Sequence, residues 1–460
     1  MAEPDRSRAP ALGPAPEPHL PEIRRDGLAN GLGLVLVPAR RVPVVVLEMI
    51  VGAGSAHDGP GRAGLADLTV HLLPEGAADM GVLEIADRLA GIGATIDVGA
   101  TYDVARVRIT VLRAHVAEAL RLLADLLVRA TFPADELERL RAEREVDLLR
   151  STDDPAVVAD RAFAAELYGA HPYGAPEEGT IPSVRALRRE AFLQLYDAAY
   201  RPRNAVLVAV GDLDVGGFRD AAGEAFGRWT QGTPPAVDIS PPDRPRRGIV
   251  LVDRPGSAQS EIRIGHVGVP YTHLDAIPLR VLNHLVGGAF HSRINLNLRE
   301  RRGWTYGVRS KFEFRRGAGP FVLATSVANG VTRAAIEEIR SELEKVVEGP
   351  VAEAERALAV NSLTLGLPLT FQTPGQIADR VREIVVYNLP DRWWDAVVDR
   401  YRSVTVGDLE FAARTHIRPR ELLTVVVGDA AAIARDLAAL GPIAHRAWKA
   451  PVPAGAREFD

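Results

Sequence analysis

The chain has 460 residues, a net charge of −5, 47% hydrophobic and 25% charged residues, and no cysteine. Its length is too great for one hydrophobic core and predicts two or more soluble domains. The small net charge gives no reason to expect nucleic-acid binding. The lack of cysteine excludes disulfides, thiol nucleophiles and cysteine-ligated zinc.

The start of the chain, residues 1–22, is rich in proline and alanine, carries early acidic residues and contains no apolar segment typical of a secretory signal. We expect residues 1–22 to form a disordered tail. No run of about 18 apolar residues occurs in the chain, so we expect no membrane span. With neither kind of segment, we expect a cytoplasmic protein.

An internal repeat divides the rest of the chain. The tripeptides Arg201-Pro202-Arg203 and Val210-Gly211-Asp212 both return in the second half at one fixed offset, from Arg418 and from Val427. Each pair of tripeptides encloses an apolar run typical of a buried strand, NAVLVA and ELLTVV. Each half also combines strand-like stretches with amphipathic helices. The sequence therefore predicts an α+β fold with two homologous domains of about 200 residues in tandem, each a mixed β-sheet with helices packed on it.

The composition between the halves indicates the domain boundaries. Residues 231–247, QGTPPAVDISPPDRPRR, contain five prolines and predict an extended linker, because proline lacks the N–H that regular structure needs. We therefore expect domains at residues 23–230 and 248–440, followed by a C-terminal tail at 441–460. Two like domains joined in this way can close on each other as a clamshell, and the gap between them is a natural binding site.

Several stretches carry a resemblance to a known family. They are ANGLGLVLVP from Ala29, VGAGSAHDGPGRAGLA from Val51, LYGAHPYGAPEEGT from Leu167, RPRNAVLVAVGD from Arg201 and GGAFHSRINLNLRERRGWTYGV from Gly287. On these stretches the chain resembles the pitrilysin/insulinase-type zinc metallopeptidases, in the short form with two homologous domains per subunit. The resemblance runs from about Leu28 to Asp429.

The resemblance implies that the stretch GLADLTVH, residues 64–71, is a degenerate zinc motif. In active members the residues after GLA read H-x-x-E-H: the two histidines share a helix face and bind zinc, and the glutamate is the general base. Here Asp67 takes the place of the first histidine, Val70 that of the base, and His71 that of the second histidine. Asp147 stands at the family's spacing from His71 and takes the place of the downstream glutamate. Val70 cannot accept a proton, and Asp67 replaces a zinc ligand, so we expect no metal cofactor in this chain.

Two interpretations of these residues stay open at this point. Asp67, His71 and Asp147 could bind a metal weakly as a set of one nitrogen and two oxygens. Alternatively, His71 is an ordinary helix residue hydrogen-bonded to Asp67 one turn earlier. We favour the second interpretation, because zinc sites prefer nitrogen-rich ligand sets.

The second half keeps a different part of the family pattern. The resemblance assigns Arg299 and Tyr306, seven residues apart, to the Arg/Tyr pair that faces the zinc across the cleft, and Gly287 and Gly288 to a substrate-binding loop before it. An Arg fork suits a peptide carbonyl or carboxylate, and a Tyr hydroxyl can donate to a developing oxyanion. The alternative is an arginine-rich helix end, because helix C-termini favour cations.

Eight other histidines show no ligand spacing paired with a nearby acid that could serve as base, and we assign them no function. They are His57, His115, His171, His266, His273, His284, His291 and His416.

These patterns together predict a non-catalytic, zinc-free subunit of a heterodimeric zinc metallopeptidase. The expected partner is a paralogous subunit that carries H-x-x-E-H and the zinc, and the expected substrate is an unfolded peptide extended along an edge strand. No nucleic acid or membrane is expected as a partner. One alternative is a peptide-binding or structural scaffold of the same fold with no role in catalysis. Another is a self-sufficient enzyme that uses Asp67, His71 and Asp147, which the loss of the base at Val70 disfavours.

Overall fold

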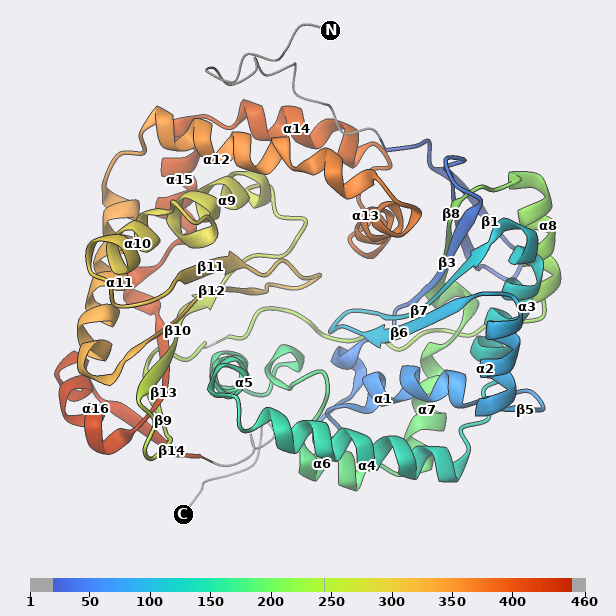
Figure 1. Cartoon of the computed structure of the whole chain (residues 1–460), viewed down its shortest axis with the longest axis horizontal. Coiled ribbons are helices and arrows are strands. Elements are labelled where there is room, and N and C mark those ends of the chain that lie inside the picture. Colours follow the sequence, from blue (N-terminus) through green and yellow to red (C-terminus); the bar gives the residue numbers. More distant parts are fainter. Residues whose placement is uncertain (1–19, 244, 449–460) are drawn as a thin grey trace, which may run out of the picture.

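A computed structural model describes residues 20–243 and 245–448 of the chain. It contains two six-stranded mixed sheets, one from each half of the chain, with helices packed on both (Figure 1). The predicted α+β fold with two tandem units is confirmed. Most of the expected tails, residues 1–19 and 449–460, lies outside the described residues.

The two sheets have the same strand order over five strands. The first runs β1-β2-β8-β3-β7-β6 and the second runs β14-β9-β13-β10-β12-β11. In the first sheet the strands are β1 (Arg24–Gly27), β2 (Gly33–Pro38), β3 (Val44–Val51), β6 (Thr95–Ala100), β7 (Ala105–Leu112) and β8 (Ala205–Gly211). In the second they are β9 (Gly248–Asp253), β10 (Gln259–Val267), β11 (Val308–Phe312), β12 (Pro320–Ala328), β13 (Leu423–Gly428) and β14 (Ile443–Ala447). A two-stranded hairpin, β4 (Gly76–Ala77) and β5 (Met80–Gly81), stands apart.

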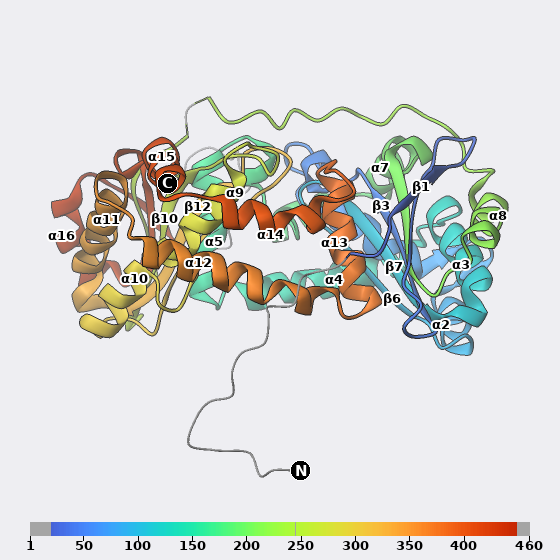
Figure 2. The same cartoon turned by 90° about the horizontal axis from the view of Figure 1, so that it is seen from above.

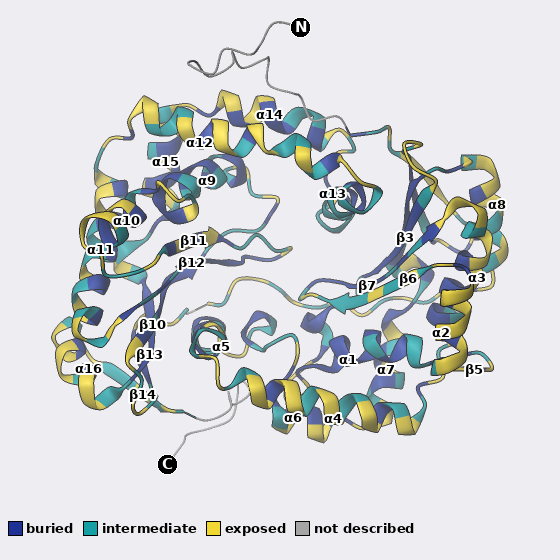
Figure 3. Cartoon of the chain, in the orientation of Figure 1, coloured by how far each residue is buried: buried dark blue, intermediate teal, exposed yellow. Residues whose placement is uncertain are grey.

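The strands of the sequence repeat occupy equivalent places. β8 lies parallel to β2 and antiparallel to β3, and β13 lies parallel to β9 and antiparallel to β10. The repeated tripeptides therefore reflect one fold used twice. Both strands are almost entirely buried because they lie centrally in their sheets and are covered on both faces, which explains their apolar composition (Figure 3).

The outermost strands of the two sheets differ. The structure also shows that both expected tails, at residues 1–22 and 441–460, were given too many residues. β1 forms an antiparallel hairpin with β2, whereas β14 lies parallel to β9. The boundary expected at residue 440 is therefore wrong, because Ile443–Ala447 completes the second sheet instead of belonging to a tail. At the other end, Leu20 is 4% exposed and belongs to an apolar cluster formed by residues of both halves, so the tail expected at residues 1–22 is too long.

Sixteen α-helices surround the sheets within the described residues. Those of the first half are α1 (Leu65–Leu72), α2 (Val82–Gly91), α3 (Val116–Val128), α4 (Ala134–Ser151), α5 (Pro155–Tyr168), α6 (Ile181–Ala186), α7 (Arg189–Ala199) and α8 (Val215–Phe226). Those of the second half are α9 (Ala276–Asn283), α10 (Arg293–Asn295), α11 (Thr332–Glu348), α12 (Glu353–Leu365), α13 (Pro374–Val386), α14 (Trp393–Ser403), α15 (Val406–His416) and α16 (Ala430–Leu437).

One helix of each half packs on the sheet of the other half. α5, from the first half, packs on β10 and β13, and α13, from the second half, packs on β3 and β8 (Figure 1). Phe163 of α5 shares an apolar cluster with Val425 and Val427, while Val381 of α13 shares one with Val208 and Val210. The exchange buries the inner face of each sheet against the other half, so the two halves are joined by apolar surface as well as by the linker.

A charged network accompanies the exchanged helix α13. Glu48 on β3 is fully buried and accepts hydrogen bonds from Arg108 Nε at 2.7 Å and from Arg382 Nη1, on α13, at 2.9 Å. Arg108 also donates to Asp379 of α13 at 2.6 Å. Burial alone would raise the pKa of Asp379, but the hydrogen bonds and charges of Arg108 and Arg382 together outweigh it and hold this pKa below its ordinary value. The network ties the first sheet to the second half.

The proline-rich segment runs along one side of the molecule. No helix or strand occurs at residues 231–243 or 245–247, and Figure 2 shows the segment passing from α8 at one end of the molecule towards the second sheet at the other. This agrees with an extended linker. No helix in the described part of the chain is long and apolar enough to cross a membrane.

Candidate functional site

The degenerate zinc motif lies on α1. The helix starts after Gly64, whose φ of +91° and close approach to the Glu178 backbone leave no room for a side chain. Asp58 accepts hydrogen bonds from the N–H groups of Gly64 at 2.8 Å and Ala66 at 2.7 Å and so satisfies the start of the helix. Burial raises the pKa of Asp58 to about 8, although these N–H groups oppose the rise. The motif therefore stands on a short, firmly positioned helix.

Val70, at the position of the general base, belongs to the core of the first half. Its side chain is fully buried among apolar residues. Asp67 and His71 lie one turn apart on another face, and His71 Nδ1 lies 2.7 Å from the Asp67 backbone oxygen and 3.5 Å from its carboxylate. His71 therefore makes the local helix contact with Asp67 that the second interpretation predicted, chiefly through the backbone.

The guanidinium of Arg144 lies next to the Asp67 carboxylate. Arg144 of α4 lies 2.5 Å from the Asp67 carboxylate, and both side chains are largely buried, at 16% and 10% exposure. Asp147 is far more exposed, at 70%, and its nearest ion-pair partner is Arg150 at 3.9 Å. The structure thus brings Asp67 and His71 together, but α4 presents Arg144 to Asp67 in place of Asp147. Sequence reasoning missed Arg144, which stands one helical turn before the position examined.

This arrangement predicts that α1 holds no divalent ion. A metal at Asp67 would have to displace Arg144 or accept a full positive charge beside it, which is unfavourable at low exposure. We expect His71→Ala to leave the zinc content of the purified, dialysed chain unchanged, as measured by elemental analysis. A loss of one zinc per chain in this variant would show that the degenerate motif still binds metal.

The glycines of the GGAF stretch have packing roles. Gly287 is buried at a π-helical turn (His284–Gly288) where a Cβ atom would lie 2.6 Å from Ser310 Oγ on β11. At Gly288 a Cβ atom would lie 2.7 Å from Asn283 Nδ2. The two glycines therefore allow the turn to approach β11 and the end of α9. Their expected contact with substrate stays a prediction.

The Arg/Tyr pair lies at the surface of the second half. Arg299 belongs to a π-helical segment (Leu296–Arg301), and its guanidinium stacks 4.0 Å from the ring centre of Phe290, which is 55% exposed. Gly303, with a φ of +64°, ends the segment, and the chain then turns into β11. Tyr306 in this turn is 96% exposed. Tyr306 is therefore open to contact with another molecule, whereas Arg299 is 32% exposed and partly covered by its own neighbours.

A cavity of about 600 Å³ lies between the two halves. Arg315 and Glu313 from the second half and Glu177 and Tyr102 from the first contribute to its walls. Arg315 is paired with Glu313 at 2.7 Å and stacks 4.0 Å from the Tyr102 ring. Burial raises the pKa of Glu177 to about 7, with Arg315 opposing the rise. The cavity combines charged and aromatic groups of both halves.

The family of the chain follows from sequence comparison. The sequence pattern of insulinase (peptidase family M16) matches residues 34–180, and that of the peptidase M16 inactive domain matches residues 186–363. The chain belongs to this family, and the resemblance inferred from its motifs is confirmed.

Its relatives include chains that are described as uncharacterized zinc proteases. It is 27% identical over 420 residues to an uncharacterized zinc protease of Mycobacterium tuberculosis (strain H37Rv), covering 88% of this chain and 93% of the relative. It is 23% identical over 409 residues to an uncharacterized zinc protease of Streptomyces coelicolor, covering 88% and 89%.

Solved structures share the fold over nearly the whole chain. The peptidase M16 inactive domain from Pseudomonas fluorescens superposes with a TM-score of 0.84 and 26% identity, covering 89% of this chain and 99% of that one. A protease from Helicobacter pylori superposes with a TM-score of 0.83 at 19% identity, covering 89% and 100%, which shows the fold alone. The chain is therefore a two-domain, peptidase-like protein of this family.

Proposed function

We propose that this chain is the non-catalytic subunit of a heterodimeric metallopeptidase. Its partner would be a paralogous chain that carries an intact H-x-x-E-H and the zinc. The observation that carries the proposal is the contrast between the two candidate sites. The motif on α1 has a buried valine at the base position and a guanidinium beside Asp67, whereas Tyr306 is 96% exposed and Arg299, seven residues before it, is 32% exposed. A pair that serves another subunit has to be exposed in the isolated chain.

The chemistry divides between the subunits in this proposal. The partner supplies the metal and the base that activate water. Tyr306 donates a hydrogen bond to the oxyanion that forms at the scissile carbonyl, and Arg299 orients the peptide. The substrate is an unfolded peptide, and β6, an open edge of the first sheet, offers unpaired backbone groups along which an extended chain can bind.

The proposal is tested by reconstitution with an H-x-x-E-H paralogue from the same genome. We expect this chain alone to hydrolyse no unfolded peptide and the mixture to hydrolyse it at least about 10-fold faster than the partner alone, because the partner lacks the oxyanion donor. The measurement is steady-state hydrolysis of a fluorogenic peptide, with complex formation followed by size-exclusion chromatography. Assembly without a gain in rate would favour the alternative, a scaffold protein with no role in catalysis.

A further inference from the structure

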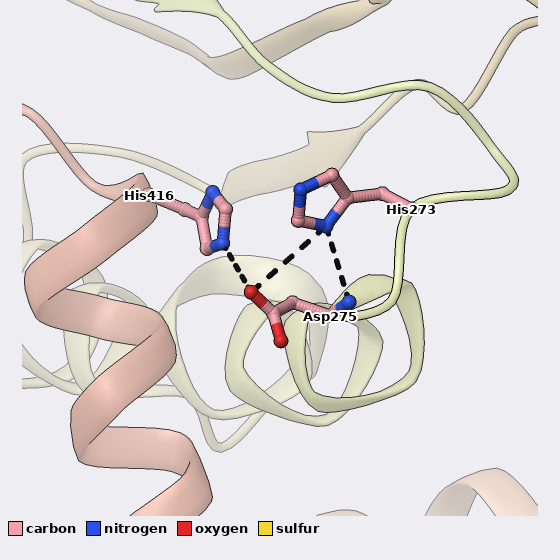
Figure 4. A group of neighbouring side chains, drawn as sticks. All are labelled: His273, Asp275 and His416. Atoms are coloured by element: carbon pink, nitrogen blue, oxygen red, sulfur yellow. Dashed lines mark hydrogen bonds and ion pairs between the residues drawn. The ribbon is translucent and has the colours of Figure 1, made fainter.

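Three side chains with metal-ligating groups meet in the second half of the chain. His273 and Asp275 lie in the loop before α9, with Asp275 next to the first helical residue, and His416 is the last residue of α15 (Figure 4). One ligand atom of each lies within 4.8 Å of the other two. In the part of the chain that the structure describes, no other group of three or more His, Cys, Asp or Glu residues is this close.

The distances are near those of a metal site. Asp275 Oδ2 lies 2.6 Å from His416 Nε2 and 3.9 Å from His273 Nδ1. Ligand atoms 2.0–2.1 Å from a tetrahedral zinc lie about 3.3 Å from one another. One distance is shorter than this value and the other is longer, and side-chain movements of about 1 Å would bring both to it. Two imidazoles and one carboxylate form a ligand set that zinc and related divalent ions use.

The ligand atoms are also accessible. The Asp275 N–H donates to His273 Nδ1 at 3.1 Å, so this nitrogen is unprotonated, and an ion that binds there replaces this hydrogen bond on its single lone pair. The side chains of His273, Asp275 and His416 are 35%, 26% and 11% exposed, which leaves a path for an ion. His273 also lines a cavity of about 530 Å³, where water can complete the coordination of an ion with three protein ligands.

We propose that His273, Asp275 and His416 bind one divalent transition-metal ion of the zinc class, which links the start of α9 to the end of α15. α9 and α15 already pack against each other, so an ion here would reinforce an existing contact. The proposal goes beyond the proposed function and does not depend on it. It revises the expectation that the chain holds no metal, which was drawn from the motif on α1.

The first measurement is calorimetric titration of the chelator-treated, full-length chain with zinc chloride. We expect one ion per chain with a Kd of roughly 1–10 μM or tighter. Because the ion binds the folded state, zinc in excess should also raise the melting temperature by a few degrees. A Kd in the millimolar range would mean that the contacts are only an ion pair and a hydrogen bond, and it would overturn the proposal.

Matched variants locate the site. His416→Ala and Asp275→Asn should each weaken zinc binding at least about 10-fold, whereas His115→Ala, an exposed histidine of the first half, should leave it unchanged. Anomalous diffraction at the zinc edge, from crystals of the wild-type chain grown with zinc, should place the ion between the three side chains. Full binding in both cluster variants would overturn the proposal. Loss of zinc binding in His71→Ala instead would overturn both the proposed site and the proposal that the motif on α1 is zinc-free. Loss of zinc binding only in the cluster variants would support the proposed site and leave the proposed function unaffected.

Discussion

Replacing Tyr306 by Phe should lower kcat of the reconstituted peptidase on the order of 10²-fold, by analogy with the loss of one oxyanion-hole donor. The substitution removes one hydroxyl and almost no volume. Because Tyr306 is 96% exposed, the melting temperature of the isolated chain should not change measurably. The measurement is steady-state peptide hydrolysis by the assembled pair, with melting curves of each variant.

Arg299 offers a second test of the same surface. Arg299→Ala should also lower kcat or weaken substrate binding, because it removes the cation stacked on Phe290. Arg301→Ala, an exposed arginine two residues further on, is the matched control and should retain full activity. Wild-type rates from both Tyr306→Phe and Arg299→Ala complexes would exclude the pair from the chemistry and place the scaffold alternative ahead.

Replacing Arg108 by Ala should lower the free energy of unfolding by about 3 kcal/mol, because it removes a partner from a buried carboxylate. Glu48 is fully buried, and Arg108 donates to it at 2.7 Å and to Asp379 of α13 at 2.6 Å. Arg382 remains 2.9 Å from Glu48 and limits the loss. Since the network ties α13 to the first sheet, both halves should unfold at a lower denaturant concentration. The measurement is denaturant unfolding followed by circular dichroism.

The matched control lies two residues earlier on the same strand. Arg106 pairs with Asp97 at 2.6 Å, but the Asp97 side chain is 59% exposed. Arg106→Ala should therefore cost less than about 1 kcal/mol. A double variant, Arg108→Ala with Glu48→Gln, should recover part of the loss because the uncompensated buried charge is gone. Equal losses for Arg106→Ala and Arg108→Ala would mean that the network does not hold the halves together.

Residues close in the sequence determined the parts of the site that were predicted correctly. Asp67 and His71 stand four residues apart on one short helix, so their spacing indicated that His71 contacts Asp67 one turn away, whereas the missing base at Val70 was inferred from the resemblance to the family motif. Arg144 was not predicted, because the pattern of α4, with many charged residues, does not show which of them faces α1. Its role follows from how α4 packs beside α1. The same limit applies to His273 and His416, which lie far apart in the sequence and share no local pattern.

The sequence by itself determined the family, the two-fold repeat and the buried central strands, because these depend on local patterns: apolar runs at β8 and β13, proline in the linker and short motifs at fixed spacing. Only the tertiary structure decided how the halves join and which charges meet. The apolar face of α5 or α13 predicts that the helix packs against an apolar surface, but it does not determine which of the two sheets provides that surface. Chain connectivity and the packing of both sheets together place α5 on β10 and β13, and α13 on β3 and β8. That exchange brings Arg382 and Asp379 to Glu48 and Arg108, a contact between distant parts of the sequence that no local pattern encodes.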